Sequence, residues 1–99
     1  MKKKFPKFIT IMGRKVVIKQ VSELKNEAGE DLAGECDYNK KIILIHKDQT
    51  HEEKCDTLVH EATHFFLELT GISQKIDENT SEVYCQLIAA LFHDLKNDI

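Results

Sequence analysis

Hydrophobic and polar positions change their period halfway along this chain. In the first half, short apolar segments separated by turn residues predict four strands, at residues 8–12, 16–18, about 32–38 and 42–45. Gly13 and Arg14 predict a tight turn between the first two strands, and the polar stretch 22–32 predicts a loop. Because the last strand is an uninterrupted apolar run, it is expected to be buried on both faces.

The second half has the period of helices. Thr50 followed by Glu53 forms a capping-box pattern, so a helix is expected to begin there. Gly71 supplies its C-terminal stop. Between these ends the apolar residues recur on one helical face, at Leu58, Ala62, Phe65 and Leu69.

A second helix is expected from about Asp77, because several candidate N-cap residues crowd together there. Its apolar residues also fall on one side, which is expected to face the core: Tyr84, Leu87, Ile88, Leu91 and Leu95. Strands followed by helices predict an α+β fold, with a small N-terminal antiparallel or mixed sheet packed by two C-terminal helices. With 99 residues, 41% of them hydrophobic, residues 1–99 are expected to form one domain.

The first predicted helix contains the motif His60-Glu61-Ala62-Thr63-His64, which has the form HExxH. Histidines at i and i+4 project from the same side, one turn apart, as two ligands of one Zn²⁺ do. Glu61 lies about 100° around the helix from His60, where it can reach a metal-bound water without binding the metal. The apolar face lies nearly opposite the histidines, which leaves them in solvent or beneath another element.

The second helix offers a further ligand. Glu82, Gln86, Ala89 and His93 recur at spacings of four, three and four on a polar strip, and Glu78 lies one turn earlier. A carboxylate from this strip would complete a His₂Glu site with an open position for water. Alternatively, the acidic residues are only a solvated face near the helix start, where they suit the helix dipole. His93 is a less favoured third ligand.

From about residue 32 to residue 95, the chain resembles the small prophage-type zinc metallopeptidases related to the ImmA/IrrE group. Their second helix has a pattern close to E-x-x-A-N-x-F-A, and the corresponding residues here run from Glu82 to Ala89. The resemblance implies a zincin-like fold with Zn²⁺ as cofactor, Glu82 as third ligand and Gln86 in the supporting amide position. Because the connection after the motif is short, Glu78 stays an alternative ligand. Leu67 stands where a metzincin requires glycine.

These features predict a zinc-dependent metallopeptidase that hydrolyses a peptide bond in a protein substrate. Glu61 would act as general base and then general acid on a zinc-bound water. An extended substrate could add to the 42–45 strand or to a neighbouring sheet edge. The alternatives are a non-catalytic, zinc-containing protein-binding or regulatory module of a prophage, and a site that stays dormant until a partner binds. Glu61 favours the enzyme, since a structural site needs no base.

The composition limits the kinds of binding partner and the cellular compartment that are expected for this chain. A net charge of −3 with 31% charged residues gives no sign of a nucleic-acid or membrane partner, and Lys2–Lys4 are expected to be a solvated terminus. The sequence has no apolar run of membrane-spanning length and no signal-peptide core, so a cytoplasmic protein is expected. Cys36, Cys55 and Cys85 predict buried, reduced thiols rather than disulfides. His46 and His51 are expected to be surface or capping residues.

Overall fold

The computed structural model describes residues 5–98, and the side chains of residues 73 and 94–98 lie outside that description, as do Lys2–Lys4. Four strands form one mixed sheet in the order β1-β2-β4-β3. Strands β2 and β4 pair in parallel, and the two outer pairings are antiparallel. The strands are β1 (Phe8–Ile11), β2 (Arg14–Val21), β3 (Gly34–Asp37) and β4 (Ile42–His46). The sheet therefore has β3 at one edge and β4 in its interior.

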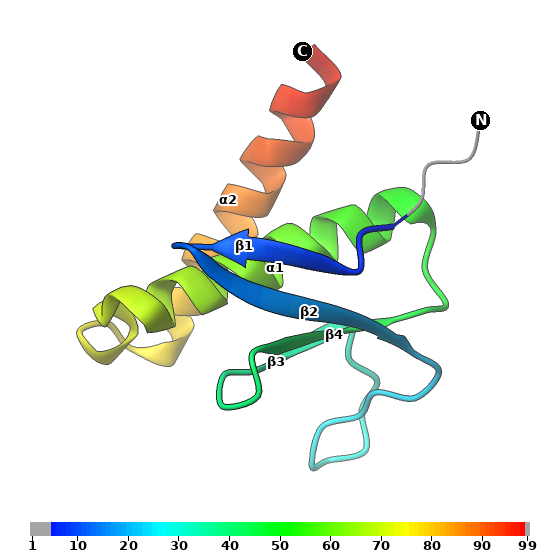
Figure 1. Cartoon of the computed structure of the whole chain (residues 1–99), viewed down its shortest axis with the longest axis horizontal. Coiled ribbons are helices and arrows are strands. Elements are labelled where there is room, and N and C mark those ends of the chain that lie inside the picture. The colour runs from blue at the N-terminus through cyan, green and yellow to red at the C-terminus, as the bar shows by residue number, and fades with distance from the viewer. Residues whose placement is uncertain (1–4, 99) are drawn as a thin grey trace.

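Two helices follow the sheet. They are α1 (His51–Thr70) and α2 (Glu78–Asp98), joined through the short 3₁₀ helix η1 (Ile72–Gln74). Helix α1 crosses one face of the sheet, whereas α2 packs mainly on α1 and its later turns project away from the body of the molecule (Figure 1). The expected α+β class is confirmed, and α1 is the helix that covers the sheet.

The ends of both helices follow from local side-chain chemistry. The Thr50 side chain accepts a hydrogen bond from the Glu53 N–H at 3.1 Å, and the Glu53 carboxylate accepts one from the Thr50 N–H at 2.8 Å. Gly71 caps the other end of α1 in the left-handed conformation, with φ +78°. Asp77 Oδ1 accepts the Thr80 N–H at 2.6 Å, which fixes the start of α2. These predicted boundaries are confirmed.

The core lies between the sheet and α1. Phe65 packs there against buried residues of β1, β2 and β4, and Leu58, Ala62 and Leu69 pack around it, as the helical pattern predicted. Ile43 and Ile45 are fully buried, but the alternate positions of β4 are only half-buried. The prediction that this strand is buried on both faces is wrong, because α1 covers only one face of the sheet.

The prediction that the apolar side of α2 faces the core is also wrong. Tyr84, Leu87, Ile88 and Leu91 are exposed, while Ser81 and Cys85 are buried instead; the side chain of Leu95 lies outside the described part. The cause is that α2 turns its polar strip, not its apolar stripe, toward α1.

Within residues 5–98, none of the helices is both long enough and apolar enough to cross a membrane. Cys36, Cys55 and Cys85 are all free, as predicted, but only Cys85 is buried; Cys36 and Cys55 are half-buried. Residues 22–32 form the expected loop, with a single bridge between Lys25 and Asp31.

Candidate metal centre

His60 and His64 project from successive turns of α1, beneath α2, with ring centroids 5.0 Å apart. Glu82 of α2 contacts both: its Oε1 lies 2.7 Å from His60 Nε2 and its Oε2 lies 3.1 Å from His64 Nε2. One donor atom from each of the three residues lies within 4.8 Å of the other two. The fold thus brings the HExxH histidines and Glu82 into a group that could hold a metal ion.

The donor set fits a zinc ion. Two imidazoles and one carboxylate are ligands that zinc takes, and donor atoms bound to one tetrahedral Zn²⁺ lie about 3.3 Å apart. Here the three donor atoms lie within 4.8 Å of one another, and Glu82 contacts each imidazole through a different carboxylate oxygen. A metal ion would bind these atoms in their deprotonated form.

The other expected ligands lie elsewhere. Glu78 lines a cavity beside the site but is not part of the donor group found among the described residues. His93 contacts α1 instead, with Nδ1 3.1 Å from Asp56 Oδ1 and Nε2 3.4 Å from Glu52 Oε1. Its two contacts are a second polar link between the helices. Gln86 is exposed and lines a cavity on the far side of the donor group.

Glu61 is buried beside the donor group, only 9% exposed. Burial raises the pKa of its carboxyl group, because removal from water disfavours the charged form. A hydrogen bond from Cys36 and the nearby histidines His60 and His64 act in the opposite direction. The carboxylate is therefore a better proton acceptor than one in water, while it still has a hydrogen-bond donor.

That donor is the thiol of Cys36 on β3. Its Sγ lies 3.3 Å from Glu61 Oε1 and 3.2 Å from the Glu61 carbonyl oxygen. Burial strongly raises the pKa of Cys36, so the thiol keeps its proton and remains a donor. The sequence predicted only a free thiol here, because no local spacing connects β3 with the motif.

Gly34, the first residue of β3, lets this strand approach α1 closely. A Cβ atom at this position would lie 2.7 Å from Thr57 Cγ2 and 2.9 Å from Glu61 Cγ, which is closer than real contacts allow. The absence of a side chain at Gly34 is therefore what seats Glu61 against the sheet. Sequence reasoning missed this residue.

Ser81 supports His64. Its Oγ lies 3.4 Å from His64 Nδ1, and Ser81 itself is buried. An imidazole that binds a metal through Nε2 carries its proton on Nδ1 and donates it to such a partner, which fixes the orientation of the ring. The sequence signal was its position directly before Glu82.

Two cavities, of about 500 and 440 Å³, flank the donor group and share Leu32, Gly34, Glu61 and Glu82 in their walls. They form a cleft between α2 and the start of β3. The larger cavity also reaches Tyr38, whose ring packs edge-on against Phe65 with centroids 5.2 Å apart.

The remaining predicted residues are peripheral. His46 accepts a hydrogen bond from the Asp48 N–H at 3.1 Å, and the His51 ring lies edge-on to Phe5. Cys55 lines neither of the two cavities.

Searches against known protein families, curated proteins and solved structures found no match for this chain. Its function is therefore argued from the donor group and the residues around it.

Proposed function

We propose that this chain is a zinc-dependent metallopeptidase of the kind related to the ImmA/IrrE group. The observation that carries the proposal is the donor group of His60, His64 and Glu82, with the buried carboxylate of Glu61 beside it. A structural zinc site usually has four protein ligands and needs no base. Three donors next to a buried, basic carboxylate are typical of a hydrolytic centre.

In this proposal His60, His64 and Glu82 hold the ion. Bound zinc supplies a Lewis acid for the substrate carbonyl and lowers the pKa of a water molecule to about 7. Glu61 accepts the proton of the attacking water and then delivers it to the leaving amine. Cys36 keeps the Glu61 carboxylate in place through its hydrogen bond, and Ser81 does the same for the ring of His64.

The edge strand β3 supports a peptide as the substrate. Gly34, Glu35 and Cys36 line the larger cavity, and β3 pairs with β4 on one side only. Its other edge can bind an extended peptide through backbone hydrogen bonds. The interior strand β4 cannot do so, because it pairs with β2 and β3 on both sides.

The alternative is a non-catalytic zinc module, in which the ion only fastens α2 to α1. The placement of Glu82 on α2 and of both histidines on α1 favours this reading, since an ion held by all three residues would connect the two helices. The two functions make the same prediction for zinc binding and different ones for Glu61.

The site is tested by zinc titration of the purified chain after removal of metal. We expect one zinc per chain in the wild type and at least a tenfold weaker Kd in His60→Ala, His64→Ala and Glu82→Ala. Glu78→Ala is the matched control, because it removes a neighbouring carboxylate of α2 outside the donor group. Unchanged zinc affinity in all three ligand variants would contradict the assignment.

A further inference from the structure

The outward face of α2 is apolar over a wide area. Six large hydrophobic side chains on it are between 42% and 62% exposed: Val83, Tyr84, Leu87, Ile88, Leu91 and Phe92. At 100° per residue they cover about half of the helix circumference. Glu82 lies on the opposite side of α2, and Ser81 and Cys85 border the face next to Ile88 and Phe92, so α2 cannot turn this face inward without breaking the donor group.

The area of this face is at the upper end of what a monomer normally exposes. If each of the six side chains offers roughly half of about 200 Å², the face presents about 600 Å² of mostly apolar surface. The largest apolar patch on a typical monomeric protein is about 300–600 Å², and it is often an interaction site.

The first half of this face contains a groove of about 420 Å³. Thr80, Val83, Tyr84 and Leu87 line it, together with Asn79. The first four stand at positions i, i+3, i+4 and i+7, which are the four positions that form a hole in knobs-into-holes packing. The groove thus has the form that receives a side chain from another helix.

The second half of the same face carries side chains suited to fill such a groove. Leu91 and Phe92 are 56% and 47% exposed, on the part of α2 that projects beyond the body of the molecule (Figure 1). Helix α2 therefore carries both the groove and, further along its axis, the side chains of Leu91 and Phe92 that could fill such a groove.

We propose that the chain forms a two-fold homodimer in which the α2 helices of two copies pack antiparallel. The projecting half of each α2 then covers the groove of the other, with Leu91 entering the hole around Thr80, Val83, Tyr84 and Leu87. A two-fold interface requires a surface complementary to itself, which this face is. The antiparallel direction also places the helix dipoles in opposition.

The area is sufficient for such a dimer. Two faces of about 600 Å² bury about 1,200 Å² in total, which is the lower end of the range for specific interfaces. The centre of the contact consists of Tyr84 and Leu87, and aromatic residues at the centre are typical anchors of interfaces.

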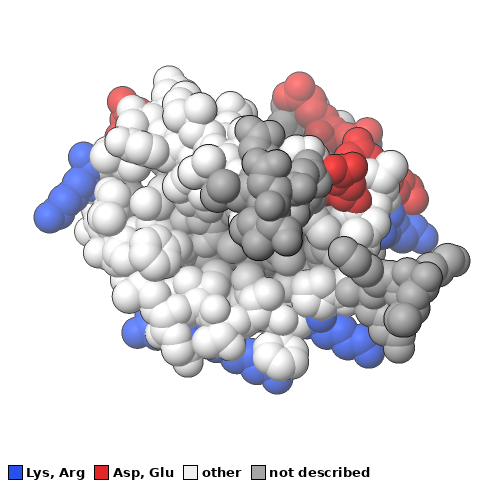
Figure 2. Space-filling model, turned by 90° about the horizontal axis from the view of Figure 1, so that it is seen from above, with Lys and Arg blue, Asp and Glu red and all other residues white. Residues whose placement is uncertain are grey.

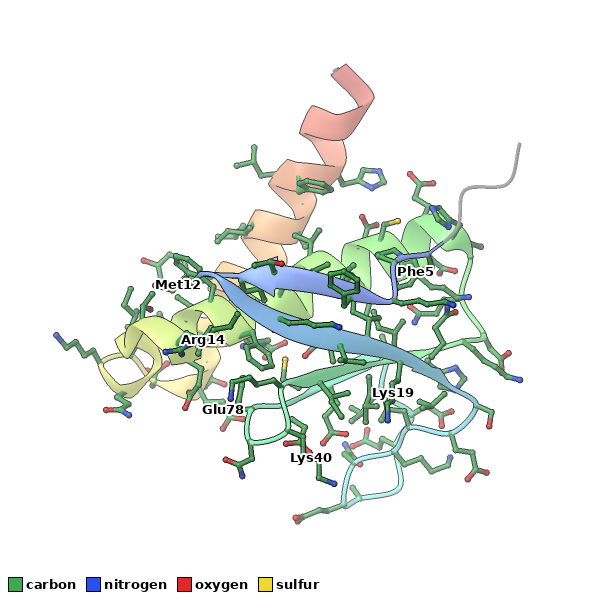
Figure 3. The ribbon with its side chains drawn as sticks, in the orientation of Figure 1. Phe5, Met12, Arg14, Lys19, Lys40 and Glu78 are labelled. Carbon is green, nitrogen blue, oxygen red and sulfur yellow. The ribbon has the colours of Figure 1, made fainter. Side chains whose placement is uncertain are left out.

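The test is sedimentation velocity of the full chain between about 1 and 200 µM, in chelator and in zinc. We expect a concentration-dependent dimer in both solutions. The dissociation constant of the dimer should be at least tenfold higher in Leu87→Glu and Leu91→Glu. Met12→Glu is the matched control: Met12 is 58% exposed but lies in the β1–β2 turn and not on α2, and this variant should dimerise like the wild type (Figure 3).

A wild type that sediments as a monomer at 200 µM overturns the proposal. That result is also expected if the apolar face of α2 binds a different protein instead of a second copy. Dimerisation that is equally strong in both α2 variants also overturns it. Leu91→Ala, a milder change at an exposed position, repeats the measurement if a glutamate variant fails to fold, and it should weaken the dimer about tenfold. Because the measurement in chelator is made without zinc, its result does not depend on whether the assigned residues bind a metal.

Discussion

Glu61 depends on two residues of another element. Cys36 gives its carboxylate a hydrogen bond, and Gly34 leaves the space in which its side chain lies. Neither residue belongs to the donor group of His60, His64 and Glu82. The position and burial of the Glu61 carboxylate are therefore properties of the contact between β3 and α1, and changes in β3 should affect hydrolysis before they affect metal binding.

The catalytic role is tested with Glu61→Gln. The amide cannot accept a proton, so hydrolysis of a peptide that the wild type cleaves should fall by about 10²–10⁴-fold. Zinc affinity should stay within about threefold, because Glu61 is not one of the three donors. Glu27→Gln, a surface change in the 22–32 loop, is the control and should alter neither quantity. A Glu61→Gln protein that cleaves the peptide as fast as the wild type would show that Glu61 is not the base.

Gly34→Ala tests the close approach of β3. The added Cβ must push aside Thr57 or Glu61, and we expect the free energy of unfolding to fall by about 1–3 kcal/mol, as in other overpacked sites. Hydrolysis should fall by more than the stability loss explains. The measurements are urea denaturation and peptide turnover at saturating zinc.

The matched control for this change is Gly13→Ala. Gly13 has φ +78° and open space around it, so alanine there introduces backbone strain of about 1–2 kcal/mol without any clash. It should lose stability and keep its specific activity. If both variants lose activity in parallel with stability, Gly34 has no special role at the site.

Among the residues of the site, the sequence predicted those that are related by local spacing along a helix. His60 and His64 follow from one helical turn, and Glu82 follows from the polar strip on the next helix. Cys36, Gly34 and Ser81 could not be predicted, because their roles depend on which element packs beside which. A thiol 25 residues before Glu61 gives no periodic signal.

At the start of helix α2, the contribution of the Asp77 cap to stability can be tested by changing the pH. The hydrogen bond from the Thr80 N–H holds the pKa of Asp77 below its ordinary value. A depressed folded pKa means that the cap stabilises the fold above the unfolded pKa, near 4, and that this stabilisation is lost as the pH falls through the folded pKa. The difference in unfolding free energy between wild type and Asp77→Ala should therefore shrink between pH 6 and pH 3.

Asp77→Asn is the control for this prediction. Asparagine caps helices about as well as aspartate but does not titrate. Its difference from Asp77→Ala should stay constant over the same pH range in urea denaturation. A constant difference for the wild type as well would show that the carboxylate does not contribute through its charge.

The order and ends of the elements were largely predictable, because capping residues and hydrophobic periods are local. What α2 packs against was not. Amphipathic periodicity shows that Tyr84 and Leu87 share a side, but it does not show whether a sheet, another helix or a second molecule covers that side. Likewise, the apolar run of β4 does not reveal that a helix covers only one face of the sheet.

Over the whole molecule, charge is divided between the two halves of the chain. Residues 1–50 contain eleven Lys and Arg against seven Asp and Glu, whereas residues 51–99 contain three against ten. On the face seen in Figure 2, most of the visible acidic side chains gather in one corner. Within the described part of the chain, the two cavities at the donor group are lined by several acidic residues and by no Lys or Arg.

This distribution predicts a preference for basic peptides. If the chain is a peptidase, a substrate with lysines on both sides of the cleaved bond should have at least a tenfold higher kcat/KM than its glutamate counterpart at low salt, because the acidic cleft concentrates positive charge. The preference should shrink in about 0.5 M salt, which screens the attraction. Equal rates for the two peptides at low salt would show that the charge of the cleft does not select the substrate.

The donor group and the residue that holds Glu61 in place come from separable parts of the chain. His60 and Glu82 are only 22 residues apart, in neighbouring helices, whereas the partner of Glu61 comes from a strand that precedes α1. If the chain is the proposed enzyme, substitutions in that strand should change hydrolysis while the helices continue to bind the ion. Active and inactive proteins built on this fold should then differ first around β3.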